Sequence, residues 1–279
     1  MKKMRLISLS MLMIVYVLIQ SSCKKDHDRH DQGNPPQIPP SSTFLMKFSE
    51  LDSAKIPGGI YKTELDSKSV YSNYLYSAGN VFVWNAIITV GLAVPVASFL
   101  NSFNYQAVWN NSENAWIWQY SFTVYSDQFT AKLKAKIVGN QVHWEMYISN
   151  QNGFQDFLWY SGDSMIDGTE GTWTLYDNPI SNTELLGILW HRNVSLGTSD
   201  ITYTNIVPGG PENGGYISYG ITTDSIYNAY YDIFNKGKNN HTNIKWNQTY
   251  KNGRVCDSLH FGDTNWHCWD VDYTNIVCQ

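Results

Sequence analysis

The stretch "AWIWQYSFTVYSDQFTAKLKAKIVGNQVHWEMYI", residues 115–148, alternates apolar and polar side chains over three successive segments. Such alternation is typical of β-strands with one buried face. The residues expected to face inward are Trp116, Trp118, Tyr120, Phe122, Val124, Phe129, Ala131, Leu133, Ala135, Ile137, Val142, Trp144, Met146 and Ile148. Those expected to face outward include Lys132, Lys134, Lys136, His143 and Glu145. The short connections "YSDQ" and "VGNQ" predict consecutive antiparallel hairpins.

The alternation of apolar and polar residues continues, less strictly, toward the C-terminus. The segments "TWTLYD", "LLGILWHRN", "DITYTNIV", "GGYISYGIT", "YNAYYDIF" and "TNIKWNQTY" each read as a strand. Together with the Cys-bearing end they predict about ten to thirteen strands. An antiparallel meander of this width must curl or split, and its apolar face needs a cover.

The segment "VFVWNAIITVGLAVPVASFL", Val81 to Leu100, is the large apolar element available as that cover, and it carries no charge. It lies in a helical pattern from about Asp66 to Phe103, with Asp66 or Ser67 as the N-cap. The predicted fold class is therefore α+β, mostly β. An N-terminal helical segment packs against the concave side of a long curved antiparallel β-meander that resembles a half-barrel.

Three residues, Gly79, Gly91 and Pro95, interrupt this helical pattern and predict a kinked helix or two helices. The run is also long enough to span a bilayer. Gly91 and Pro95 break it, however, and no cluster of Lys or Arg follows to hold a span in place. We therefore expect a helix buried against the sheet rather than a membrane anchor.

The N-terminus has a basic head with Lys2, Lys3 and Arg5, a short apolar run, and then Ser21-Ser22-Cys23. This pattern indicates a signal peptide. The Cys after small residues resembles a bacterial lipoprotein signal, and "SSCKKD" is similar to exported lipoproteins of Bacteroidota. The resemblance implies that residues 1–22 are removed and that Cys23 carries acyl chains. The protein would then be anchored to a membrane of the bacterial cell envelope, by expectation the outer membrane.

Residues 23–42 are charged and then Pro-rich, so they predict a disordered tether between the anchor and a single domain at 43–279. Charged residues make up 15% of the chain and the net charge is −5, which offers no basic surface for nucleic acid. The sequence has no phosphate-binding loop, nucleophile elbow or metalloprotease helix motif. We expect no cofactor.

Three cysteines remain after the signal, Cys256, Cys268 and Cys278, and export favours one disulfide among them. Cys268 and Cys278 flank nine residues, which is enough for the tail to fold back. Cys256 and Cys268 could instead face each other across the last turn. We favour Cys268 with Cys278, which leaves Cys256 free.

Three groups of polar residues are candidates for chemistry. Cys256, His260, Asp263, His267, Cys268 and Asp270 are zinc-ligand types, but their spacing fits no standard pair of ligand knuckles. Asp163, Asp167 and Glu170 are carboxylates near turns, which are usually local turn-formers rather than a glycosidase pair. His191 and Arg192 at a strand end could contact an anion, or simply be solvated.

Two functions of different classes fit these features. The first is a non-catalytic binding or carrier module for an apolar or lipid ligand, because the architecture resembles periplasmic lipoprotein carriers with a half-barrel sheet over helices. The alternative is a surface module that binds glycan or protein through exposed aromatic rings. An enzyme without a recognisable site is the third. An apolar cavity under the helix favours the carrier, whereas an exposed aromatic strip favours the surface module.

Overall fold

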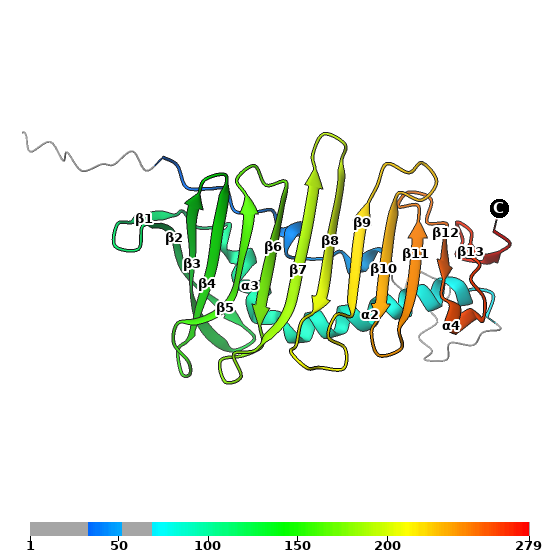
Figure 1. Cartoon of the computed structure of the whole chain (residues 1–279), viewed down its shortest axis with the longest axis horizontal. Helices are drawn as coiled ribbons and strands as arrows, with labels where there is room; N and C mark the ends of the chain where they lie inside the picture. Colours follow the sequence, from blue (N-terminus) through cyan, green and yellow to red (C-terminus); the bar gives the residue numbers. More distant parts are fainter. Residues whose placement is uncertain (1–32, 52–68, 279) are drawn as a thin grey trace, which may run out of the picture. The chain divides into compact units, whose positions relative to one another are not determined.

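The computed structural model describes residues 33–51 and 69–278, and the chain forms one compact unit from Pro35 onward. Its described strands form a single sheet in which each strand pairs with the next along the chain, from β1 to β14 (Figure 1). All these pairings are antiparallel. The predicted mostly-β fold with an antiparallel meander is confirmed. The sheet is open, with β1 and β14 at its edges.

The strands are β1 (Val108–Asn110), β2 (Ala115–Val124), β3 (Asp127–Val138), β4 (Gln141–Asn150), β5 (Phe157–Met165), β6 (Glu170–Tyr176), β7 (Glu184–Asn193), β8 (Thr198–Asn205), β9 (Tyr216–Ile221), β10 (Ala229–Asn235), β11 (Asn240–Trp246), β12 (Gly253–Cys256), β13 (His267–Trp269) and β14 (Asn275–Ile276). The helical elements are η1 (Ser41–Thr43), η2 (Phe48–Glu50), α2 (Ser72–Gly91), α3 (Ala93–Ser102) and α4 (Ser258–Phe261). The strand count exceeds the expected range because the sequence pattern does not reveal the short β1 or the irregular β5.

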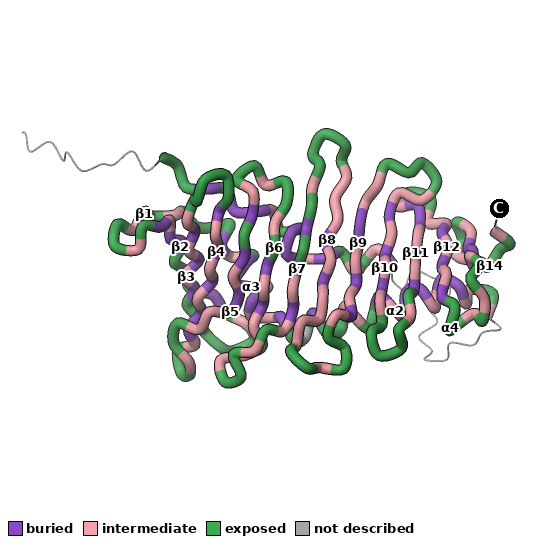
Figure 2. Tube along the Cα trace, in the orientation of Figure 1, coloured by how far each residue is buried: buried purple, intermediate pink, exposed green. Residues whose placement is uncertain are grey.

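Burial along the strands alternates as the sequence predicts (Figure 2). In β4, Val142, Trp144, Met146 and Ile148 are all buried on what we call the inner face. Ile137 is an exception, because it lies near the end of β3 and is 42% exposed. On the outer face, the ammonium of Lys134 lies 3.1 Å from the Glu145 carboxylate and 3.3 Å from that of Glu113.

Large indole rings on the inner face lie over glycines of the neighbouring strand. The cross-strand pairs are Gly162 with Trp173, Gly171 with Trp190 and Gly253 with Trp269. A Cβ atom on any of these glycines would approach the paired indole to between 2.3 and 2.6 Å. These glycines therefore provide the space in which a ring can lie flat against the sheet, which is how the sheet buries so many tryptophans.

Residues 35–51, which we call the strap, run along the inner face and belong to the core. Ile38 and Phe44 are buried, and the Phe44 ring stacks on Phe99 with centroids 4.6 Å apart. The Tyr203 hydroxyl donates to the Phe44 carbonyl at 2.7 Å and accepts from the Met46 N–H at 2.8 Å. The predicted boundary of a disordered tether at residue 42 is therefore wrong, since packing begins near Pro36. The earlier part of the tether and the signal lie outside the described residues.

Two separate helices, α2 and α3, complete the cover of the inner face, which is one of the two arrangements predicted. The Gly91 carbonyl has no donor four residues on, because Pro95 lacks an N–H. The chain breaks at Leu92, and the two helix axes differ in direction by 77°. Pro95 falls in the first turn of α3, where a missing N–H is tolerated. The proposed N-caps Asp66 and Ser67 lie outside the described residues.

The helix pair crosses the sheet from its last strands to its first. At the start of α2, the Asn73 side chain donates to the Cys268 carbonyl at 2.9 Å, and Tyr74 packs edge-on against Trp269. In α3, the Ser98 carbonyl accepts from the Tyr120 hydroxyl at 2.5 Å, and Phe99 packs edge-on against Trp173. The expected contact between helix and inner face is thus made at both ends of the pair.

Only one face of α2 is buried, and the opposite face is exposed. Val81 and Ile88 are 1% and 7% exposed, whereas Phe82, Val83 and Ile87 are more than half exposed. In the described part of the chain, no helix on its own has the length and apolar composition of a membrane span. Helices α2 and α3 meet those criteria only as a pair, across their bend.

Candidate functional site

An apolar cavity of about 500 Å³, open on one side, lies at the corner between α2 and α3. Its helical side includes Ile88 of α2 and Val96 and Ala97 of α3. The strap contributes Leu45, Met46 and Phe48. The end of β2 and the exposed Tyr125 that follows it border the same space. The cavity exists because a 77° bend between two helices leaves a corner that side chains do not fill.

The polar groups of this cavity are largely engaged with protein partners. The Tyr203 hydroxyl is held by the strap backbone, and the Thr89 hydroxyl donates to the Asn85 side chain at 3.0 Å. No charged side chain is among the described residues that line it. A volume of several hundred Å³ with apolar walls suits a small apolar molecule or one end of a larger one.

The sequence does not predict the strap as part of this site. Residues 23–42 have the composition of a tether, and no pattern in residues 43–51 connects them with the helix. The available signal was the run of apolar side chains at Ile38, Phe44, Leu45 and Met46, which a solvated linker does not need. Tyr203 was recognised as a strand residue but not as the anchor of the strap.

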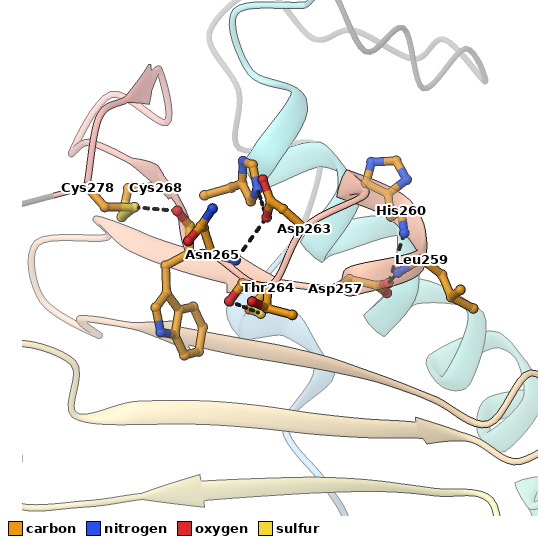
Figure 3. A network of polar contacts seen from close by, with 11 residues as sticks. Asp257, Leu259, His260, Asp263, Thr264, Asn265, Cys268 and Cys278 are labelled. Atoms are coloured by element: carbon orange, nitrogen blue, oxygen red, sulfur yellow. Dashed lines mark hydrogen bonds and ion pairs between the residues drawn. A yellow bond between two sulfur atoms is a disulfide. The ribbon is translucent and has the colours of Figure 1, made fainter.

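Asp257, in the polar C-terminal region, is 2% exposed. Figure 3 shows it beside Leu259 and His260. Its carboxylate caps the short helix α4 by accepting from the N–H groups of Leu259 and His260, each at 3.1 Å. It also accepts from the side chains of Tyr76 of α2 at 2.5 Å, Asn240 at 2.8 Å and Thr242. Five donors therefore converge on one buried carboxylate and tie α2 to the end of the sheet.

The pKa values around Asp257 follow from these contacts. Burial alone would raise the pKa of the Asp257 carboxyl, but the hydrogen bonds from Thr242, Tyr76 and Asn240 outweigh it and hold the pKa below its usual value. Burial and the bond to Asp257 raise the pKa of Tyr76. Burial lowers the pKa of His260, whose ring stacks on Tyr76 with centroids 3.6 Å apart. The hydrogen bonds to Asp257 make it a structural cap rather than a general base.

A cavity of about 590 Å³ lies beside this network, lined in part by Tyr76, Lys238 and His260. The other predicted zinc-ligand types have partners of their own: His267 Nε2 lies 3.1 Å from Asp263 Oδ1, and Asp270 accepts from the N–H of Thr274. Within residues 33–51 and 69–278, no three such side chains are grouped to hold a metal ion.

The sulfur atoms of Cys268 and Cys278 lie 2.07 Å apart, and Cys256 is a free thiol. The pair at disulfide distance is the one favoured from the spacing. Burial raises the pKa of the Cys256 thiol, with Asp257 and Asp263 acting in the same direction. Cys256 therefore lacks the lowered pKa that marks a nucleophilic cysteine.

The three candidate carboxylates do not form a facing pair. Asp163 lies within β5, ahead of the turn, and contacts His143 on the neighbouring strand at 2.8 Å. Asp167 is in the following turn, where it accepts from the Thr169 hydroxyl, and Glu170 begins β6. The local pattern missed β5 because Ser161, Gly162 and Ser164 interrupt its apolar alternation.

His191 and Arg192 are successive residues of β7 and therefore point to opposite faces of the sheet. His191 Nδ1 contacts Asp200 Oδ2 of β8 at 2.9 Å. Arg192 shares the inner side with the buried Trp190 and borders a separate hollow. Cys23, the proposed site of lipid attachment, lies outside the described residues.

We predict that Asp257→Asn lowers the free energy of unfolding at pH 7 by about 2–4 kcal/mol, because an amide cannot accept from all five donors. A carboxyl whose pKa is lowered in the folded state stabilises it above the unfolded pKa near 4, and this contribution is lost as the pH falls through the folded value. Urea unfolding from pH 7 to pH 3 should show that the difference in unfolding free energy between the wild type and Asp257→Asn becomes smaller. A difference that stays constant with pH contradicts this account. So does an equal loss of unfolding free energy in the exposed control Asp272→Asn.

Comparisons of this chain with protein-family models, with curated proteins and with solved structures find no match. Its function is therefore argued from its own residues.

Proposed function

We propose that the protein is a non-catalytic binding or carrier protein for an apolar or lipid ligand, which occupies the cavity at the bend between α2 and α3. The observation that carries the proposal is the uncharged lining of this cavity, with Leu45, Ile88 and Val96 among its walls. An apolar molecule placed there loses its contact with water without leaving a charge unpaired.

The distribution of aromatic side chains favours this function over the surface module. Six of the eleven tryptophans are buried on the inner face, whereas Trp84, Trp109, Trp116 and Trp266 are only half-buried; the six are Trp118, Trp144, Trp173, Trp190, Trp246 and Trp269. Tyr and Phe residues that are exposed, such as Phe82 and Tyr250, belong to different elements. Most of the indole surface therefore faces the core, which favours the carrier over recognition of glycan by a strip of exposed indole rings.

We predict that the chain from Gly33 onward binds the neutral fluorescent probe N-phenyl-1-naphthylamine. Ala97→Phe places a ring in the cavity and should weaken binding at least about tenfold, or ~1.4 kcal/mol. The matched control is Ala86→Phe, on the exposed side of α2. Fluorescence titration measures both, and urea unfolding checks that both variants fold. No binding by the wild type, or equal weakening by the two variants, would remove the cavity as the binding site.

The second part of the proposal is lipid anchoring at Cys23 in the cell envelope, which rests on the resemblance of "MKKMRLISLSMLMIVYVLIQSSC" to a lipoprotein signal. Several acyl chains on one residue bind a membrane stably, whereas a single chain does so only marginally. The anchor would keep the carrier domain beside the membrane that supplies or receives its ligand.

We predict that Cys23→Ala abolishes labelling by a radioactive fatty acid in cells and moves the protein from the membrane fraction to the soluble fraction. Cys256→Ala is the control, because it removes a thiol from the folded domain and should leave both readouts unchanged. A Cys23→Ala variant that stays in the membrane fraction would assign the anchoring to another segment.

A further inference from the structure

A second hollow, of about 330 Å³, lies where β7 turns into β8 and the strap passes the inner face. Strap residues Ser42 and Lys47 form one side of it, and Arg192 at the end of β7 forms another. Figure 1 shows the connection between β7 and β8 at one end of the sheet. The connection between β2 and β3, which borders the apolar cavity, lies at the opposite end because the meander alternates its turns.

The strand register determines which charges face this hollow. Arg192 pairs with Ser199, and Trp190 pairs with Ile201, on the inner side of β7 and β8. The carboxylate of Asp200 points to the outer face, where His191 holds it at 2.9 Å. Asp200 borders the hollow, but its carboxylate is on the other face of the sheet. The charged side chains on the side of the hollow are therefore those of two cations, Lys47 and Arg192.

The strap is held in place at this point, so the two cations sit on fixed backbones. The Tyr231 hydroxyl donates to the Lys47 carbonyl, and the Arg192 N–H donates to the Thr169 carbonyl at 2.6 Å. The Arg192 guanidinium donates to the Gly168 carbonyl at 3.5 Å. No carboxylate of the described residues lies within 4 Å of the Lys47 or Arg192 side chain. Hydroxyls of Ser42, Thr198 and Ser199 line the same space.

We propose that this hollow binds an oxyanion, carboxylate or phosphate, through the Lys47 ammonium and the Arg192 guanidinium. A planar guanidinium donates two parallel hydrogen bonds to such a group, and the ammonium adds a mobile point charge. The hydroxyls can donate to the remaining oxygen lone pairs. The carboxylate of the neighbouring Asp200 is turned away from the anion, because it contacts His191 on the other face of the sheet.

The hollow and the apolar cavity share Leu45 of the strap as a lining residue. An amphiphile with an apolar chain and an anionic head could therefore occupy both, and this source of the anion rests on the proposed carrier function. A free small anion is the other source, and it requires only the hollow. The chemistry at Lys47 and Arg192 is the same in both cases.

The test uses the full folded domain from Gly33 onward at pH 7.5 and two ligands. Inorganic phosphate is titrated by calorimetry, and dodecanoate is measured by its displacement of N-phenyl-1-naphthylamine, with dodecanol as the uncharged counterpart. The double variant Lys47→Gln, Arg192→Gln is compared with Lys136→Gln, Lys236→Gln, which removes the same charge elsewhere. Circular dichroism and thermal unfolding verify that both double variants fold.

We expect the Lys47, Arg192 variant to lose at least about tenfold in affinity for phosphate or dodecanoate, as the removal of charge-assisted contacts predicts, while the control variant matches the wild type. Loss for phosphate assigns a free anion, and loss for dodecanoate without phosphate binding assigns the head group of an amphiphile. The anion site is overturned if the two double variants bind each ligand with equal affinity. It is also overturned if the wild type binds neither phosphate nor dodecanoate.

These outcomes separate the anion site from the proposed function. Retained binding of the neutral probe and of dodecanol, with no effect of the Lys47, Arg192 variant on dodecanoate or phosphate, overturns the anion site and leaves the apolar carrier. Phosphate binding that depends on Lys47 and Arg192, with no binding of the neutral probe, supports the anion site and overturns the carrier.

Discussion

The apolar inner face of the open sheet is the constraint on which the rest of the structure depends. Buried side chains on this face extend from Trp118 in β2 to Trp269 in β13, and such a surface is unstable in water without a cover. Neither helix alone reaches from the first strands to the last. The cover is therefore composite, with α2 near the last strands, α3 near the first and the strap along the inner face.

A cover of several pieces leaves spaces where the pieces meet, and both proposed sites arise in this way. The apolar cavity lies where α2, α3 and the strap come together. The cationic hollow lies where the strap passes the ends of β7 and β8. In contrast, Asp257 joins α2 to the end of the sheet, because its carboxylate accepts five hydrogen bonds and one of them comes from Tyr76 of α2. Binding would thus depend on the same packing that stabilises the fold.

The sequence predicted those features that a local periodicity encodes. The inward residues of β2 to β4, apart from Ile137, follow from their spacing, and the helix break near Gly91 and Pro95 follows from those two residue types. The role of the strap did not, because its burial is decided by contacts with residues far along the chain, such as Tyr203 and Tyr231. The cavity was unpredictable for the same reason, since its walls come from four separate segments. The exposed face of α2, with Phe82 and Ile87, cannot be distinguished by composition from its buried face.

The central claim is that the inner face of the sheet is covered by one defined face of α2, and neighbouring residues of that helix test it most directly. Ile88 is 7% exposed and Ile87 is 60% exposed. Two variants of the chain from Gly33 onward are compared by circular dichroism and urea unfolding. Ile88→Asp places a carboxylate at a buried position, and Ile87→Asp places one at a solvated position. A buried, unpaired charge costs several kcal/mol, comparable to the whole stability of a domain. The account predicts that Ile88→Asp fails to fold and that Ile87→Asp folds with nearly unchanged stability. A folded Ile88→Asp variant as stable as Ile87→Asp would contradict it.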